Sequence, residues 1–395
     1  MRRILLVLTL ALAACETPEA PPEEAEPALT LEPIGFADLA GWAADDHAAA
    51  LATFLPGCAR WAKKDPTAAI GRAPAYGTAA DWAAVCEAAE AVALGDRTAA
   101  RAFFETWFEP WRVTDGDGAT GLFTGYYEPT LDGGLTPSAV NDVPLFGRPD
   151  DLVTVDLGAF AEDLAGRTVA GRVEEAALVP YEDRAAITAS ALDGRAAVLV
   201  WVDDPIDAFF LQIQGSGRVR LAEGGELRLG YAAQNGRSYY AIGQALVERG
   251  GLTKDAVSLQ TIRAWLEAHP DEADAVMNLN GSYVFFRVLD GPGPVGAFGV
   301  ALTPGRSLAV DRRFVALGVP LWLDVTVPGP AEGVPDESLR RLVVAQDTGG
   351  AIKGVVRGDL FWGGGAEAEW RAGTMKHDGT YAVLLPKALV VATGD

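Results

Sequence analysis

Histidine, cysteine and positive charge are all scarce in this chain of 395 residues. It has 3 histidines and 3 cysteines. Because a zinc site draws on clustered cysteine and histidine ligands, and His47, His269 and His377 lie far apart, no metal site is predicted. Lys and Arg number 32 against 54 Asp and Glu, for a net charge of −22. That balance argues against a nucleic-acid partner, whose phosphates need a basic protein face.

Common cofactor and nucleophile motifs are also missing. The chain has no Walker loop, no GxSxG and no HExxH. Residues 291–296 match GxGxxG formally, but two prolines and the lack of a following helix contradict a dinucleotide site. Ser216, in a Gly-Ser-Gly turn, has no clear histidine partner. No cofactor is therefore predicted, and proton transfer is assigned to carboxylates.

The long apolar run lies at the N-terminus. Residues 1–15 (MRRILLVLTLALAAC) have two arginines, an apolar stretch and small residues, the pattern of a secretory signal. Their ending resembles the bacterial lipobox, which implies acylation of Cys15, and Glu16 at the next position implies delivery to the outer membrane. Residues 16–33 are rich in Glu and Pro and predict a disordered tether. No later segment is apolar enough to cross a membrane.

Two cysteines remain once Cys15 is acylated. Cys58 and Cys86 form an even pair in an oxidising compartment. We predict a structural disulfide between them, which contributes roughly 3 kcal/mol to the free energy of unfolding.

The residue types and their spacing change after about residue 120. Residues 36–113 are rich in Ala, with aromatic residues at three-to-four spacing, and predict helices whose aromatic side chains pack together. After Gly121, short β-branched runs between Gly, Pro and Asp predict a mostly antiparallel or mixed barrel. Helices are predicted at 237–248 and 254–267. The clearest strand predictions are 196–202, 209–214, 283–287, 320–327 and 380–385.

Two aspartates stand out in the Gly-rich run DTGGAIKGVVRGDLFWGGG (347–365). Asp359 precedes Leu, Phe and Trp, and apolar surroundings raise the pKa of a carboxyl group, as a general acid near neutral pH requires. Asp347 follows an apolar strand-like run and precedes Thr-Gly-Gly. We therefore interpret it as a turn carboxylate with freer access to water or backbone N–H groups. Ordinary turn chemistry would give the same pattern.

Three further strings suit carbohydrate, because aromatic rings contact sugar faces and amides satisfy sugar hydroxyls. They are GLFTGYYEP (121–129), LQIQGSGR (211–218) and NGRSYYAIG (235–243). Gln212 and Gln214 are predicted to share one face of a strand. The tyrosines of these strings could equally pack in cores.

These strings, together with residues 280–287, 293–324 and 345–363, resemble the membrane-bound lytic murein transglycosylase A family. The C-terminal strings are similar to the three-Asp domain, whose aspartates fall here at Asp311, Asp347 and Asp359. The resemblance covers roughly residues 120–390. One departure is Gly281, where the family pattern has Pro; it loosens a turn and removes no chemical group.

The resemblance implies a mainly β protein with an N-terminal helical segment. Residues 34–130 and 285–395 would form a double-psi β-barrel domain, and residues 131–284 an inserted β-domain, with a groove for a glycan strand between them. Asp359 would be the catalytic acid and Asp347 its structural or electrostatic partner. The implied substrate-binding residues are Thr124, Tyr126, Tyr127, Gln214, Ser216 and Lys353.

The implied reaction breaks the β-1,4 bond between N-acetylmuramic acid and N-acetylglucosamine without water. One aspartate would act as acid and then as base, leaving 1,6-anhydromuramyl ends. Two alternatives stay open: a hydrolase with Asp347 or Asp311 as second carboxylate, and a non-catalytic lipoprotein that binds the cell wall. The expected partners are peptidoglycan strands and, through the lipid, the periplasmic face of the outer membrane. Association with complexes of cell-wall synthesis or division is unresolved, as is exo or endo action.

Overall fold

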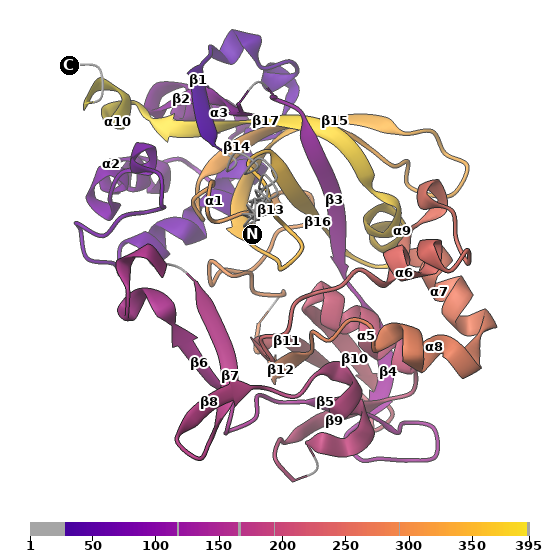
Figure 1. Ribbon diagram of the computed structural model, residues 1–395. Helices are drawn as coiled ribbons and strands as arrows, with labels where there is room; N and C mark the ends of the chain where they lie inside the picture. The colour runs from indigo at the N-terminus through magenta and orange to yellow at the C-terminus, as the bar shows by residue number, and fades with distance from the viewer. Residues whose placement is uncertain (1–27, 117, 165–166, 193, 292, 393–395) are drawn as a thin grey trace, which may run out of the picture.

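The structure is a computed structural model that describes residues 28–392 except 117, 165–166, 193 and 292. Its larger sheet draws strands from both ends of the chain (Figure 1). The strand order is β1-β2-β17-β14-β15-β13-β16-β3, and β17 also pairs with β3, so the six strands from β17 to β3 close a barrel. The strands are β1 (Leu29–Pro33), β2 (Phe108–Asp115), β3 (Gly121–Glu128), β13 (Ser307–Val310), β14 (Pro320–Val327), β15 (Glu337–Asp347), β16 (Arg357–Gly364) and β17 (Lys376–Pro386).

Three helices pack on the barrel and share its core: α1 (His47–Trp61), α2 (Ala79–Glu90) and α3 (Arg97–Trp107). Asp46 begins α1, because its side chain accepts a hydrogen bond from the backbone N–H of Ala49. Fully or almost fully buried aromatic rings from these helices fill the space between them, as the spacing predicted: Phe54, Trp61, Trp82, Phe103 and Phe104.

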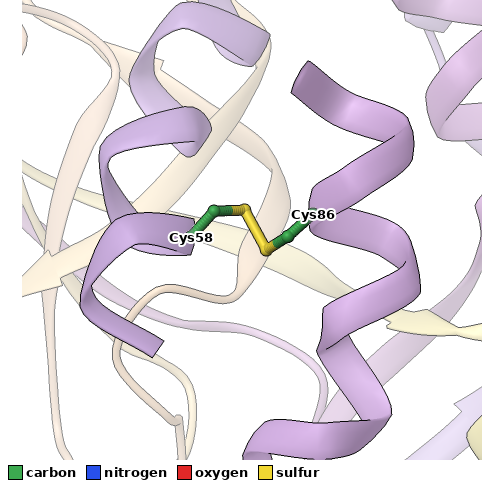
Figure 2. The surroundings of a disulfide bond; sticks show 2 residues. All are labelled: Cys58 and Cys86. Atoms are coloured by element: carbon green, nitrogen blue, oxygen red, sulfur yellow. A yellow bond between two sulfur atoms is a disulfide. The ribbon is translucent and has the colours of Figure 1, made fainter. Parts of the chain in front are cut away.

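A disulfide joins two of these helices. Cys58 of α1 and Cys86 of α2 are bonded, with their Cα atoms 5.5 Å apart (Figure 2). The bond lies beside the aromatic core and ties the helical segment together before the chain enters the barrel.

Two predictions at this end of the chain are wrong. The predicted helical region ends at Trp107, because residues 108–115 form β2 and pair with both β1 and β17. Trp111 therefore lies on a strand. The predicted tether 16–33 is also too long, since Leu29–Pro33 pair with β2 as strand β1. The signal 1–15, Cys15 and residues 16–27 lie outside the described residues.

The middle of the chain forms a second β-unit. Its six-stranded sheet has the order β12-β11-β10-β4-β9-β5, and a separate sheet has the order β6-β7-β8. The strands are β4 (Thr130–Gly134), β5 (Val143–Phe146), β6 (Val153–Asp156), β7 (Thr168–Glu174), β8 (Ala177–Pro180), β9 (Val198–Val202), β10 (Ser216–Leu221), β11 (Glu226–Gln234) and β12 (Val284–Val288). The helices of this unit are α4 (Arg184–Ala186), α5 (Pro205–Gln214), α6 (Ile242–Glu248), α7 (Leu259–Ala268) and α8 (Pro270–Met277).

The predicted strand at 209–214 is wrong: these residues belong to helix α5. Asp204 caps the helix by accepting from the Ile206 N–H, and Pro205 occupies its first turn. Gly215 ends it in the left-handed conformation, with φ of 80°. Gln212 and Gln214 therefore do not share a strand face. The helix predicted at 237–248 begins only at Ile242.

Two more helices, α9 (Ala366–Thr374) and α10 (Lys387–Ala392), follow the last barrel strands. Helix α9 packs against β3 and β16, where it meets α7 of the second unit. Throughout the described part of the chain, every helix is too short or too polar to cross a bilayer.

Candidate active site

One lateral row of side chains crosses four barrel strands. Ala309 of β13 pairs with Asp347 of β15 on one side and with Asp359 of β16 on the other. Asp359 in turn pairs with Thr124 of β3. Since neighbouring strands lie about 4.8 Å apart, the Cα atoms of the two aspartates are roughly 10 Å apart. Residues paired in this way face the same side of a sheet, so the barrel brings both carboxyl groups to one surface, with Ala309 on the strand between them.

Asp359 is held by a short chain of hydrogen bonds. The Thr124 hydroxyl donates to Asp359 Oδ1 over 2.7 Å, and Arg357 Nη2 donates to the Thr124 hydroxyl oxygen over 2.8 Å. The net pKa of Asp359 is about 6, above the ordinary value of an aspartate. Burial is the largest cause of the rise, and the nearby charge of Asp347 adds to it. The charge of Arg357 and the hydrogen bond from Thr124 act in the opposite direction and lower the pKa. A carboxyl group with this pKa keeps its proton in about a tenth of molecules at pH 7 and in about half of them at pH 6, whereas an ordinary aspartate is almost fully ionised at both pH values.

Asp347 is bound by three donors. The backbone N–H groups of Ala297 and Thr348 donate to Oδ1 over 2.8 and 2.9 Å, and the Tyr126 hydroxyl donates to Oδ2 over 3.0 Å. Burial nevertheless raises the pKa of Asp347, although all three hydrogen bonds lower it. The predicted contact of Asp347 with backbone N–H groups is therefore present, and its side chain is half-buried.

A cluster of apolar side chains, called the apolar floor below, limits the contact of both carboxyl groups with water. Tyr126 and Phe361 follow Thr124 and Asp359 by two residues, so they lie on the same face of their strands. Their ring centroids are 5.2 Å apart, and they cluster with Leu302, Ala309 and Ile352. Sequence reasoning expected the apolar surroundings of Asp359 from its chain neighbours, whereas non-local contacts supply much of them.

Asp311 serves a structural role. It is buried, and it accepts hydrogen bonds from Arg313 Nη2 over 2.6 Å and from the backbone N–H of Gly354 over 3.0 Å. Burial alone would raise its pKa, but these bonds outweigh burial and lower it. Such a carboxylate neither donates a proton near neutral pH nor moves easily toward a substrate. In the described residues, no three Asp, Glu, His or Cys side chains are grouped so as to hold a metal ion.

The second unit contributes to the surroundings of the site through Gln214. Its Oε1 accepts from the backbone N–H of Tyr127 over 3.1 Å, which ties the end of α5 to β3. Ser216 follows at the start of β10 and is buried.

Two predicted substrate-binding residues have other surroundings. Tyr127 is buried against Ala368 and Ala372 of α9, and its hydroxyl donates to Glu369 over 3.3 Å. Tyr127 and Tyr126 are adjacent on a strand and therefore face opposite sides, so only Tyr126 shares the face of Asp359. Lys353 is exposed, and among the described contacts it has none with either aspartate.

Sequence reasoning missed two residues. Arg357 precedes Asp359 by two positions on β16, a spacing that places both on one strand face and could have revealed it. Tyr239, in the loop after β11, keeps 40% of its surface exposed. Burial and the charge of Asp359 both raise the pKa of Tyr239, so the phenol lies within electrostatic range of the carboxyl group. The string NGRSYYAIG contained this signal.

Comparison with known proteins finds two matching domains. Residues 122–287 match the MltA specific insert domain, and residues 306–385 match the 3D domain. Membrane-bound lytic murein transglycosylase A of Vibrio cholerae is 31% identical over 261 residues, which cover 65% of this chain and 63% of that protein. The protein of the same name from Escherichia coli K12 is 31% identical over 279 residues, covering 70% and 69%.

Solved structures give the same result. Membrane-bound lytic murein transglycosylase from Agrobacterium tumefaciens is 34% identical with a TM-score of 0.81, and the match covers 92% of this chain and 99% of that one. Escherichia coli MltA with bound chitohexaose is 27% identical with a TM-score of 0.62, covering 90% and 91%. The fold is thus a double-psi β-barrel with an inserted β-domain. The chain belongs to the family of membrane-bound lytic murein transglycosylase A.

Proposed function

We propose that Asp359 is the single acid and base with which this protein cleaves peptidoglycan strands as a lytic transglycosylase. Lytic cleavage of murein is the activity of the family to which the chain belongs. The observation that supports the assignment of Asp359 is its desolvated carboxyl group, with a pKa of about 6, on the face shared with Thr124 and Tyr126.

In the first half of the reaction, protonated Asp359 donates to the oxygen that links muramic acid to glucosamine. The bond between this oxygen and the muramyl anomeric carbon breaks, and positive character develops at that carbon. Asp359 is now ionised. The hydrogen bond from Thr124 and the charge of Arg357 stabilise the carboxylate, because both favour its charged form.

In the second half, the ionised carboxylate takes the proton of the C6 hydroxyl of the same muramyl residue. The C6 oxygen attacks the anomeric carbon and closes the 1,6-anhydro ring. The nucleophile belongs to the substrate, so its effective concentration is high and no water is consumed. Asp359 ends the cycle protonated, as it began.

The hydrolase alternative finds less support in the geometry. Hydrolysis needs a second carboxylate that acts as nucleophile or positions water, about 5–5.5 or 6.5–9.5 Å from the first. Asp347 already accepts three hydrogen bonds, and Asp311 is bound to Arg313. We assign Asp347 the role of fixing Tyr126 and of raising the pKa of Asp359 through its charge.

A glycan strand would pass between the barrel face and the second unit, which supplies Gln214, Ser216 and Tyr239 to this region. The relative crystallised with chitohexaose, a glycan, supports this occupant. Relatives are named membrane-bound. The proposal therefore extends to a lipid on Cys15, which would hold the enzyme at the outer membrane with residues 16–27 as the tether.

Replacement of Asp359 by Asn tests the proposal. The change removes the transferable proton and keeps the size of the side chain. Release of anhydromuropeptides from purified sacculi, followed by mass spectrometry, should fall by about 10²–10⁴-fold, the usual contribution of a general acid and base. The matched control is Asp274→Asn at an exposed position of α8, which should retain wild-type activity.

Three outcomes would contradict the proposal. Near-wild-type release by Asp359→Asn would remove the assignment of this residue. Reducing ends in place of anhydro ends would identify a hydrolase. Sedimentation with sacculi without any soluble product would identify a cell-wall-binding protein.

A further inference from the structure

A cavity of about 280 Å³ lies in the second unit, between the small sheet β6-β7-β8 and strand β11. Thr154 of β6 and Thr168 of β7 line it from one side, and Tyr231 and Gln234 of β11 from the other. The two threonines share one face of the small sheet, because Thr154 pairs with Ala170 and Thr168 precedes Ala170 by two residues. The cavity is therefore rich in hydroxyl groups.

Arg148 supplies the cavity with a positive charge. Its Nη2 donates to the Leu152 carbonyl over 2.8 Å, and in the described part of the chain no carboxylate pairs with it. Burial raises the pKa of Tyr231 while the charge of Arg148 lowers it, so the guanidinium lies within electrostatic range of this phenol. An arginine without a carboxylate partner beside a hydroxyl-lined cavity offers charge-assisted hydrogen bonds to an external anion.

The cavity is close to the candidate active site. Gly236 lines it, and Tyr239, only three residues further, lies within electrostatic range of Asp359. Three residues span at most about 11 Å. Gly236 is fixed against β7: it has φ of +78°, and a Cβ added there would be 2.8 Å from the Ala170 side chain. The segment that lines the cavity at Gly236 therefore continues directly to a residue beside Asp359.

The size of the cavity indicates what it can hold. Its volume lies near the lower end of ligand sites, about 300 Å³. A site of this size takes a group as large as an amino-acid residue, not a length of glycan. A guanidinium with hydroxyl donors matches a carboxylate, which accepts several hydrogen bonds in one plane.

We infer that this cavity binds a carboxylate of the acidic peptide that peptidoglycan carries on muramic acid. The inference rests on the proposed function, since it presumes that a peptidoglycan strand lies beside Asp359. Arg148 would then be a specificity-determining residue that favours strands with peptides over bare strands.

Two substrates test the inference: glycan strands with their peptides, and the same strands after an amidase has removed the peptides. The readout is the ratio of the two kcat/KM values for anhydro-product release. Arg148→Gln should lower this ratio about tenfold, the effect of one charge-assisted hydrogen bond. Arg249→Gln is the matched control, because Arg249 is exposed at the end of α6 and has no ion pair among the described residues; it should keep the wild-type ratio.

An unchanged ratio in Arg148→Gln, or an equal loss on both substrates, would overturn the inference. If Arg148→Gln lowers the melting temperature, Thr168→Val gives a second test with the same expected direction. If the wild-type protein releases no anhydro product from either substrate, the proposed function is refuted, but the inference about the cavity is not. Calorimetric binding of a disaccharide-peptide then decides: binding weaker in Arg148→Gln than in wild type supports the cavity, and equal binding overturns it.

Discussion

Replacing Thr124 by Val should move the pH dependence of the reaction in a direction that the structure fixes. The Thr124 hydroxyl donates to Asp359 over 2.7 Å, and this bond lowers the pKa of Asp359 from the value that burial alone would give. Valine has nearly the same shape and no donor. A hydrogen bond to a charged group contributes about 1.5 kcal/mol, and 1.36 kcal/mol corresponds to one pKa unit. The pKa of Asp359 should therefore rise from about 6 toward 7.

The sign of the effect on rate follows from the role of the proton. In the free enzyme Asp359 must be protonated to act as the acid, so kcat/KM falls as the pH rises through its pKa. In Thr124→Val this fall should begin up to about one pH unit higher. The maximum rate should also drop, since the carboxylate formed in the first half loses a donor and Arg357 Nη2 loses its acceptor.

The assay is the pH profile of anhydromuropeptide release from sacculi for three proteins: wild type, Thr124→Val and Thr124→Ser. Serine keeps the hydroxyl and is the matched control, so its profile should stay close to that of the wild type. A falling limb in Thr124→Val that stays in place or moves to lower pH would refute the reasoning. In that case Thr124 does not set the pKa of the catalytic group.

Two predictions concern stability. Replacing Cys58 and Cys86 together by Ala should lower the free energy of unfolding by about 3 kcal/mol in urea titrations. Reduction of the disulfide in the wild-type protein should give a similar loss. An unchanged unfolding midpoint on reduction would show that the bond does not stabilise the fold. The folded-state pKa of Asp359 is about 6, against an ordinary value of 3.8 for an aspartate, so its ionisation lowers stability as the pH rises from about 4 to above 6. Asp359→Asn should thus be up to about 3 kcal/mol more stable than wild type at pH 8 and nearly equal at pH 3.5; equal stability at both pH values would show that the carboxyl group is not desolvated.

Strands were predicted correctly where the residue pattern fits a strand and not a helix. Residues 320–327 begin with Pro and combine β-branched and apolar side chains, and they form β14 as predicted. The apolar run 209–214 fits a buried strand or a buried helix equally well. The signals that decide lie outside the run, in Asp204, Pro205 and Gly215, and they mark a helix.

The candidate active site was likewise predictable only in part. The sequence reveals which carboxyl groups are unusual, because Asp347 and Asp359 stand in a Gly-rich run beside apolar residues. It does not reveal that β13 lies between their strands, since pairing with Ala309 depends on barrel closure and on a register set by distant residues. The opposite orientations of Tyr126 and Tyr127 could have been predicted, because adjacent residues of a strand face opposite sides.

A single carboxyl group can serve in both halves of the proposed reaction only if neither protonation state is too stable. Burial on the apolar floor favours the protonated form, which donates, whereas Arg357 and Thr124 favour the ionised form, which accepts. With burial alone Asp359 would be a weak donor, and with the hydrogen bonds alone almost no molecules would keep the proton at neutral pH. The opposed effects leave the pKa at about 6, near the pH at which donation and acceptance are both favourable. Two carboxylates with separated pKa values divide these tasks in hydrolases; here the balance around one residue allows it to perform both.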